Sequence, residues 1–262
     1  MDLDVRGKYA WVCGSTQGIG KACAIELARM GATVTLIARN ESELLKVCDE
    51  LDKSLQQKHN YIIADFSKPD DLRLKLKSYL NNLPAPHILV NNTGGPPSGA
   101  IAEAKTEEFL SAFNSHLICN HILAQAALPG MKQEKYGRIV NIISTSVKQP
   151  LKNLGVSNTI RAAVANWSKT LATEVASFGI TVNNVLPGAT NTSRIQNILE
   201  TRSQKTQKPI DELRNEMMME VPMQRFAEAS EIANAVAFLC SPAAAYITGI
   251  NLPVDGGRTG CL

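Results

Sequence analysis

The sequence predicts a single α/β domain built on a doubly wound parallel sheet of about seven strands, with helices on both faces. Short runs rich in Val and Ile recur along the chain, and stretches with apolar residues at helical spacing lie between them. Strands that alternate with helices in this way favour right-handed βαβ crossovers and a parallel sheet covered on both faces. The 262 residues, 44% of them apolar, are enough to bury one substantial core.

The expected strands are the apolar runs YAWVC, TVTLIA, YIIA, ILVN, RIVNII, TVNNVL and INLPV, at residues 9–13, 33–38, 61–64, 88–91, 138–143, 181–186 and 250–254. Between them, apolar residues recur every three to four positions, as in a helix. The expected helices are residues 19–30, 41–57, 70–80, 107–127, 158–178 and 230–239. Pro84-Ala85-Pro86 marks the loop before the fourth strand, and within the polar stretch 191–220 we expect residues 200–208 to be a surface helix or mobile loop. No repeat or shift in composition marks a second domain.

The composition excludes several classes of function. A net charge of +3 is too small to indicate nucleic acid or a membrane surface as a partner. The first residues show no cationic segment followed by an apolar one, and no apolar run approaches the roughly 20 residues that a membrane span needs. We therefore expect a cytoplasmic protein. The six cysteines form no Cys-x-x-Cys pair and have no zinc-like spacing with His, so we expect reduced thiols and no metal.

Three glycines follow the first expected strand. Gly14, Gly18 and Gly20 stand between an apolar strand and an amphipathic helix, where missing side chains let the backbone turn sharply and approach a pyrophosphate. The alternative is that they only make a tight strand-to-helix turn. Asp65 and Asn92 stand at the ends of the third and fourth strands, and such sheets bind ligands at the carboxyl ends of their strands. The pattern therefore favours a dinucleotide site.

Motifs after three of the expected strands give the chain a resemblance to a known family. They are Gly14-Ser15-Thr16-Gln17-Gly18-Ile19-Gly20 after the first strand, Asn91-Asn92-Thr93-Gly94 after the fourth, and Pro187-Gly188 with Thr192 after the sixth. On these motifs the chain resembles the short-chain dehydrogenase/reductase family over residues 8–257. Within that family it resembles the 3-oxoacyl-carrier-protein reductase group, which shares the closing Ile247-Thr248-Gly249 and Val254-Asp255-Gly256-Gly257 pattern. The resemblance implies one NAD(P)-binding Rossmann-fold domain over residues 1–262, with a substrate lid at about 191–222.

The same resemblance implies a cofactor site. In the family, the residue at Asp65 holds the adenine, the residue at Asn92 lines the adenosine and nicotinamide side, and the loop from Pro187 contacts the nicotinamide carboxamide. An ordinary turn with a helix N-cap is the alternative for that loop. The expected cofactor-binding residues are Gly14, Ser15, Thr16, Gln17, Gly18, Ile19, Gly20, Arg39, Asp65, Phe66, Asn92, Thr93, Gly94, Arg161, Pro187, Gly188, Thr190 and Thr192.

Arg39 indicates which cofactor to expect. It lies nineteen residues after Gly20, at the tip of the second expected strand. A site for NAD tends to have an acidic residue there to bind the ribose 2′-hydroxyl, whereas a guanidinium can pair with a 2′-phosphate. We therefore expect NADP(H), with NAD(H) as the less favoured cofactor. The alternative is a solvated arginine that opens a helix.

The expected catalytic positions depart from the family. Its members have a Ser, a Tyr thirteen residues later and a Lys four residues after that, and counting from Ser144 reaches Ser157 and then Arg161. Asn114 and Ser144 match the family's catalytic Asn and Ser. An aliphatic hydroxyl is a far weaker acid than a phenol with a pKa near ~10, and a guanidinium binds ribose or an anion but does not give up a proton. The expected catalytic set is Asn114, Ser144, Ser157 and Arg161.

Structural alternatives compete at two of these positions, since Ser157 could cap a helix and Arg161 could belong to an ion pair. For the whole chain, the sequence favours an NADP(H)-dependent oxidoreductase that acts on a carbonyl or hydroxyl group of a small-molecule substrate. The alternatives are an NADP(H)-binding sensor or structural subunit without turnover, and non-redox chemistry on the same fold. The resemblance also implies a homotetramer or dimer formed through helices 107–127 and 158–178.

Overall fold

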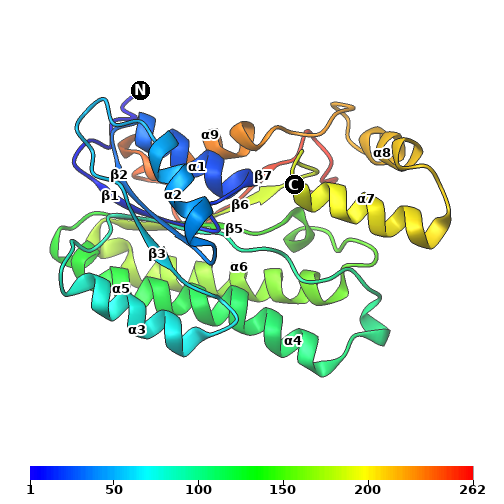
Figure 1. Cartoon of the computed structure of the whole chain (residues 1–262), viewed down its shortest axis with the longest axis horizontal. Helices are drawn as coiled ribbons and strands as arrows, with labels where there is room; N and C mark the ends of the chain where they lie inside the picture. Colours follow the sequence, from blue (N-terminus) through cyan, green and yellow to red (C-terminus); the bar gives the residue numbers. More distant parts are fainter. Residues whose placement is uncertain (262) are drawn as a thin grey trace.

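A parallel sheet is the centre of the fold. In the computed structural model, which describes residues 1–261, seven strands form one sheet in the order β3-β2-β1-β4-β5-β6-β7, and every neighbouring pair is parallel (Figure 1). The strands are β1 (Tyr9–Cys13), β2 (Thr33–Ala38), β3 (Asn60–Ile63), β4 (Ile88–Asn91), β5 (Gly137–Ile142), β6 (Ile180–Pro187) and β7 (Asn251–Val254). Each strand begins and ends within one residue of its expected bounds. The predicted doubly wound parallel sheet is confirmed.

Helices cover both faces of the sheet (Figure 1). One face is covered by α1 (Gly18–Arg29), α2 (Glu41–Glu50) and α9 (Ala229–Cys240). The other is covered by α3 (Pro69–Leu80), α5 (Cys119–Gln133) and α6 (Gly155–Val175). The segment expected to be a lid forms α7 (Ser193–Thr206) and α8 (Ile210–Met219), which extend beyond the carboxyl ends of the strands. No helix among residues 1–261 combines the length and hydropathy needed to cross a membrane.

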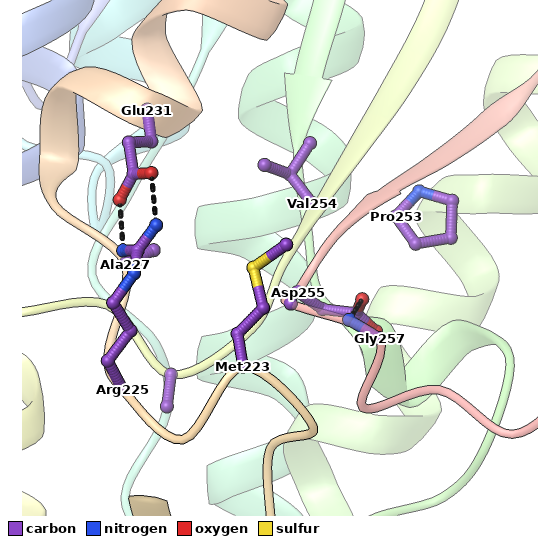
Figure 2. Close-up of a pocket in the computed structure, with 10 residues that line it drawn as sticks. Met223, Arg225, Ala227, Glu231, Pro253, Val254, Asp255 and Gly257 are labelled. Atoms are coloured by element: carbon purple, nitrogen blue, oxygen red, sulfur yellow. Dashed lines mark hydrogen bonds and ion pairs between the residues drawn. The ribbon is translucent and has the colours of Figure 1, made fainter.

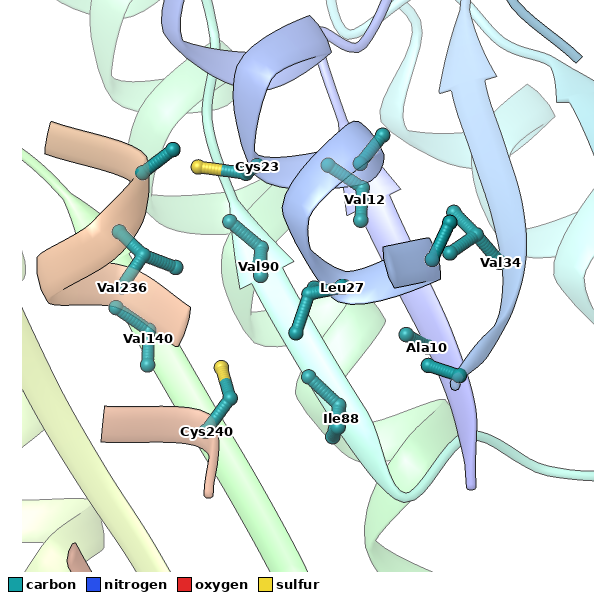
Figure 3. Packing of buried hydrophobic residues seen from close by; sticks show 14 of the residues in the cluster. Ala10, Val12, Cys23, Leu27, Val34, Ile88, Val90, Val140, Val236 and Cys240 are labelled. Carbon is teal, nitrogen blue, oxygen red and sulfur yellow. The ribbon is translucent and has the colours of Figure 1, made fainter. Parts of the chain in front are cut away.

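The inner strands of the sheet are apolar because both of their faces are buried. Figure 3 shows Leu27 of α1 and Val236 of α9 packed over Val12 of β1 and Val90 of β4, all of them fully buried. Trp11, the neighbour of Val12, is fully buried in the opposite layer. Successive side chains of a strand point to opposite faces, so a strand covered on both sides reads as a continuous apolar run.

A ladder of amides sets the register of the last four strands. Asn91, Asn141, Asn184 and Asn251 are cross-strand partners in β4 to β7. The Asn91 amide donates to Asn141 at 2.8 Å, Asn141 donates to Asn184 at 3.0 Å, and Asn184 donates to Asn251 at 2.8 Å. Buried amide donors need acceptors, and this register supplies one to each of the three donating side chains. The ladder therefore holds the loops after β4, β5 and β6 at one edge of the sheet.

The helices expected at 41–57 and 107–127 differ from the structure. The helix expected at 41–57 ends at Glu50, because Leu51 is extended, with φ −67° and ψ 145°. Just beyond it, the Asp52 carboxylate accepts a bond of 2.7 Å from the Ser54 amide, and such local bonds compete with helical ones. The helix expected at 107–127 is divided, since α4 (Thr106–Phe113) and α5 are joined by a π-helical turn at Asn114–Ile118. The apolar spacing carries no mark of the extra residue in such a turn.

Candidate active site

The glycine loop after β1 lies where the winding of the sheet reverses. From β1 the chain continues to β2 and β3 on one side, whereas β4 lies on the other side of β1. Gly14 has φ +58°, and a Cβ there would lie 2.8 Å from the Asn92 carbonyl oxygen. A Cβ at Gly20 would collide with the Gly14 carbonyl oxygen and would lie 2.7 Å from Asn92 Nδ2. The loop has no room for a side chain at the switch point, where doubly wound sheets bind ligands.

Two polar side chains hold this loop in place. Asn92 Nδ2 donates to the carbonyl oxygens of Cys13 and Gly14, each at 3.3 Å. Ser15 is fully buried, and its Oγ accepts a bond of 3.1 Å from the Ile37 amide. Asn92 and Ser15 are both expected cofactor residues, and each of them also joins the loop to the sheet.

The loop after β6 meets the glycine loop. Thr192 Cγ2 lies 3.3 Å from the position that a Cβ of Gly18 would take, and the Ser193 hydroxyl donates to the exposed Gln17 at 3.3 Å. Thr192 occupies the N-cap position of α7, but its hydroxyl donates to the Thr190 carbonyl at 3.2 Å and caps nothing. The helix-cap interpretation of this hydroxyl is therefore wrong. The expected residues of this loop lie at or directly after the end of β6: Pro187, Gly188, Thr190 and Thr192.

The expected adenine end lies after β2 and β3. Arg39 directly follows β2 and is exposed. Asp65 accepts a bond of 3.0 Å from the Ser67 amide, and this bond, with a smaller contribution from the charge of Arg39, holds the pKa of Asp65 below its usual value. Phe66 is buried in the core, so only its backbone can face a ligand.

Ser144 and Ser157 stand at the two ends of the loop between β5 and α6. The Ser144 Oγ accepts a bond of 3.1 Å from the Ser146 amide, which leaves the hydroxyl hydrogen available to donate. Helix α6 begins at Gly155, with Leu154 as its N-cap residue, so Ser157 lies buried inside the first turn. The interpretation of Ser157 as a helix cap is wrong, because the helix begins three residues earlier than expected.

Arg161 is buried on α6, and no acidic side chain of residues 1–261 pairs with it. It is 8% exposed and lies four residues after Ser157, on the same face of the helix. Its Nη1 donates to the Ile142 carbonyl at 3.0 Å, whereas its buried Nε has no partner within residues 1–261. No ion pair found in that part of the chain includes it, so the ion-pair interpretation is wrong. Burial, and then the charge of Arg194, lower the pKa of Arg161 to about 10, and it stays a cation at neutral pH.

The π-helical turn brings a histidine beside this arginine. Asn114, a member of the expected catalytic set, is the half-buried first residue of the turn, and His116 in the same turn is 3% exposed. Burial lowers the pKa of His116 to about 2. The charges of Arg161 and Arg194 act in the same direction, and a hydrogen bond with the Gly94 backbone acts against them. His116 is therefore a neutral imidazole at neutral pH.

Arg194 reaches the same place from α7. It is the second residue of that helix, it is half-buried, and its Nη2 donates to the Pro96 carbonyl at 2.7 Å. A Cβ at Gly95 would lie 3.3 Å from Arg194 Nη2 and 3.7 Å from Arg161 Nη2. The two guanidinium groups therefore converge on the loop after β4, which also carries the expected residues Thr93 and Gly94. We call His116, Arg161 and Arg194 the basic cluster.

Two members of the basic cluster, His116 and Arg194, were missed by reasoning from the sequence. A signal existed for Arg194, because a cation in the first turn of a helix is unfavourable against the positive end of the helix dipole, and α7 has no acidic residue there to offset it. His116 left no such signal, because helical spacing does not reveal a π-helical turn.

We expect a His116→Gln variant to be less sensitive to acid than the wild type. The pKa of folded His116 lies far below that of an unfolded histidine. The stability that depends on its neutral form is therefore complete above about pH 6.5 and falls progressively as the pH drops towards about 2. Gln takes up no proton, so the free energy of unfolding should shift in favour of the variant between about pH 7 and about pH 4.

Urea unfolding at both pH values measures this shift. His121→Gln, at an exposed position of α5, is the matched control. A difference between His116→Gln and the wild type that does not change with pH would contradict the assignment of His116 as a buried neutral group.

The tyrosine hydroxyls with hydrogen bonds in the structure are engaged away from the basic cluster. That of Tyr79 bonds to Thr35 at 2.6 Å, and those of Tyr61 and Tyr136 donate to the Glu41 carboxylate and the Cys240 carbonyl. None of these groups is in the expected catalytic set. These three tyrosines therefore do not supply a phenol at the expected catalytic positions.

The cysteines and carboxylates form no metal centre in the part of the chain described. Cys13, Cys23, Cys119 and Cys240 are buried free thiols. Burial raises the pKa of Cys119 and of Cys240 to about 12, so both stay protonated. No group of three or more His, Cys, Asp or Glu within residues 1–261 is placed to hold a metal ion.

A pocket of about 340 Å³ lies outside the expected site, beside the carboxyl end of β7. Figure 2 shows Met223, Val254 and Asp255 around it, with the two bonds of 2.6 and 2.7 Å between Arg225 and Glu231 at its side. None of the expected site residues lines it, and its arginine is already paired with a carboxylate. This pocket is therefore less suited to bind an anion than the basic cluster, where the two guanidinium groups pair with no carboxylate of residues 1–261.

Comparisons with known proteins cover nearly the whole chain. A family model described as enoyl-(acyl carrier protein) reductase matches residues 14–259. The 3-oxoacyl-(acyl-carrier-protein) reductase FabG of Pseudomonas aeruginosa is 33% identical over 257 residues, which cover 97% of this chain and 98% of the relative.

Solved structures agree with this match. L-sorbose reductase from Gluconobacter frateurii, complexed with NADPH and L-sorbose, superposes with a TM-score of 0.93 at 31% identity and covers 100% of both chains. An actinorhodin polyketide ketoreductase solved with NADPH superposes with a TM-score of 0.88 at 30% identity, covering 97% of this chain and 98% of that one. Sheet order, glycine loop and full-length similarity agree, and the chain is a member of the short-chain dehydrogenase/reductase family of oxidoreductases.

Proposed function

We propose that the protein is an NADP(H)-dependent oxidoreductase that acts on a carbonyl or hydroxyl group with an atypical site, in which Ser157 and Arg161 replace the family's Tyr and Lys. One observation carries this proposal. A serine with an available hydroxyl hydrogen, Ser144, and a buried cation, Arg161, stand at the same edge of the sheet as the glycine loop. Together they could bind the oxygen of a carbonyl group.

The residues present fit a dinucleotide. Gly14 and Gly20 form a cradle that any Cβ would fill. The N-cap residue of α1, Gln17, makes no side-chain cap bond, so amides of the first turn remain for a pyrophosphate. Arg39 would hold the 2′-phosphate and Asp65 the adenine. Both solved relatives described above were solved with NADPH, which supports NADP(H) over NAD(H).

The chain's own residues would position and polarise the substrate. NADPH, when bound, supplies the hydride. Ser144 would donate its hydroxyl hydrogen to the substrate oxygen, and the charge of Arg161 would stabilise the negative charge that develops there. Asn114, at the π-helical turn, would support a water that supplies the proton. General acid catalysis contributes about 10²–10⁴ in rate, so reduction without a phenol should be slow but not abolished.

Two further features of the family are part of the proposal. Helices α7 and α8 would form the lid over the substrate, and the contact of Arg194 with Pro96 supports this because it joins α7 to the loop after β4. The homotetramer or dimer stays a prediction, which Leu110 and Phe113 support as exposed apolar residues on α4.

The rival function is a protein that binds NADP(H) without turnover, as a sensor or a structural subunit. The absence of a tyrosine at Ser157 favours it, because the glycine loop is complete while the usual proton donor is missing. Non-redox chemistry on the same fold is the remaining alternative.

We expect NADPH to bind at least tenfold more tightly than NADH, and an Arg39→Glu change to remove or reverse the preference, because charge-assisted bonds to the 2′-phosphate are lost. Calorimetric titration with both cofactors measures this. Arg73→Glu, on α3, is the matched control for the change of charge. A preference that survives Arg39→Glu would contradict the cofactor assignment.

The same preparations, mixed with NADPH and a panel of aldehydes and ketones, report turnover by loss of nicotinamide absorbance. Slow oxidation of NADPH that Ser144→Ala abolishes would support the proposed reductase. Tight binding of NADPH with no turnover of any carbonyl compound would favour the rival.

A further inference from the structure

Among residues 1–261, the guanidinium groups of the basic cluster donate to backbone carbonyls alone, Arg161 to Ile142 and Arg194 to Pro96. Within residues 1–261, neither Arg161 nor Arg194 forms an ion pair with a carboxylate, and Arg161 Nε is buried without a partner. Arg138 shows how a structural arginine in this protein differs. Its guanidinium lies over the Tyr136 ring and donates to three backbone carbonyls, those of Gly137, Gly179 and Ser241. Leaving a buried cation and a buried donor unpaired is costly, so such a group is a candidate for binding an anion.

The two guanidinium groups are close enough to share one ligand. Their Nη2 atoms lie 3.3 and 3.7 Å from the same point, the position of a Cβ on Gly95, so they are at most 7.0 Å apart, the sum of the two distances. A carboxylate whose two oxygens each accept a bond of about 2.8 Å can span that separation. Gly95 leaves this space open, because any side chain there would contact both groups.

Helix α7 adds to the same field. Arg194 lies in its first turn, where the helix dipole is positive, no acidic residue is present and the N-cap side chain makes no cap bond. An anion in front of this turn would interact favourably with the dipole and with both guanidinium groups. Burial is the main cause of the lowered pKa of His116, and the charges of Arg161 and Arg194 lower that pKa further.

The phosphates of a dinucleotide are expected elsewhere. The pyrophosphate belongs at the N-terminus of α1, and a 2′-phosphate belongs at Arg39, beyond β2. Arg161 and Arg194 come from α6 and α7, which follow β5 and β6 on the other side of β1. An anion bound at the basic cluster would therefore be distinct from the 2′-phosphate. Because Ser193, next to Arg194, bonds to Gln17 at the start of α1, the cofactor control below separates such an anion from the pyrophosphate.

We propose that Arg161 and Arg194 together bind a carboxylate of the substrate, so that the compound reduced is an oxo acid whose carbonyl group lies at Ser144. This inference rests on the proposed function for the carbonyl group, and it adds the substrate class. The anion site itself follows from the arginines alone.

Calorimetric titration with acetoacetate and with its neutral methyl ester tests the proposal. Both probes carry the same ketone, and only acetoacetate carries the carboxylate. The proteins compared are the wild type, Arg194→Gln, Arg194→Lys and the matched control Arg202→Gln, which lies on the same helix, is exposed and pairs with Glu216. Each titration is made with and without NADP⁺, and inorganic phosphate is a third probe.

We expect Arg194→Gln to weaken the binding of acetoacetate about tenfold or more, because a charge-assisted bond is lost, and to leave the ester unchanged. Arg194→Lys should recover part of the affinity, and Arg202→Gln should match the wild type. No binding of acetoacetate by the wild type, or equal losses for acid and ester, would overturn the proposal. Arg194-dependent binding of phosphate but not of acetoacetate would overturn the carboxylate assignment.

The cofactor provides the remaining control. If Arg194→Gln weakens the binding of NADP⁺ as much as the binding of acetoacetate, the arginines hold the cofactor and the proposal fails. If the wild type binds acetoacetate through Arg194 but binds no NADP⁺ or NADPH, the anion site stands and the proposed function is wrong.

Discussion

Restoring both missing partners, as Ser157→Tyr with Arg161→Lys, should raise the reduction of a neutral ketone by something approaching the ~10²–10⁴ that a positioned general acid contributes. Ser157 and Arg161 lie four residues apart on one face of α6, so the new Tyr and Lys would have the family's spacing. An ammonium near the phenol lowers the pKa of the phenol and makes it a better proton donor. The hydroxyl of a serine is a much weaker acid. The ketone should be neutral, because the double change removes one of the two guanidinium groups at the basic cluster.

The single changes test whether the two residues act as a unit. Ser157→Tyr alone places the phenol beside the broad fork of a guanidinium, and Arg161→Lys alone has no phenol to assist. Each single change should therefore raise the rate of ketone reduction much less than the double change. Oxidation of NADPH by the ketone measures the rates, and titration with NADPH together with thermal melting confirms that each variant folds. A double variant that folds and binds NADPH but reduces no ketone would show that the pocket has lost carbonyl reduction, and it would favour the sensor or non-redox alternatives.

Gly20→Ala should abolish cofactor binding and lower the free energy of unfolding by about 3 kcal/mol or more. In an ordinary helix the same change stabilises by about 1 kcal/mol, so the two effects have opposite signs. At Gly20 the clash decides the outcome, because the new methyl group would meet the Gly14 carbonyl oxygen and Asn92 Nδ2. The first is a backbone atom, and the second is held by its hydrogen bonds to the Cys13 and Gly14 carbonyls, so neither can move aside easily. Relief of the clash requires α1 to move away from β1 and β4, which would open the cradle for the pyrophosphate.

Gly99→Ala is the matched control, because a Cβ at Gly99 meets no atom within 4 Å. Urea unfolding and titration with NADPH measure both variants. A Gly20→Ala protein that is as stable as the wild type and still binds NADPH would show that the contact between α1 and the strand ends does not define the cofactor site.

The pattern of residues close together in the sequence was sufficient to predict the architecture and the position of part of the candidate site. The five inner strands, β2, β1, β4, β5 and β6, are short apolar runs because both of their faces are buried, and consecutive residues carry that property. The glycine spacing of Gly14 and Gly20 is local in the same way, and so is the distance from Ser144 to Ser157 and Arg161. Counting along the chain was therefore enough to place these residues at the carboxyl edge of the sheet.

Prediction from the local sequence pattern failed where the backbone departs from the expected helices. The start of α6 at Gly155 placed Ser157 inside the helix, and the π-helical turn after Phe113 turned His116 into the interior. Neither departure changes the residue types or the apolar spacing that a sequence pattern uses.

The sequence by itself determined the parallel sheet and the glycine loop, and it set Ser157 and Arg161 at a fixed count after Ser144, because each depends on neighbouring residues or on spacing along the chain. Only the tertiary structure decided that Arg161 pairs with no carboxylate of residues 1–261, and that Arg194 joins it through a bond to Pro96, which lies 98 residues away in the chain. Burial and the pairing of charges are properties of residues brought together by the fold, and they determine whether an arginine supports the structure or remains able to bind an anion.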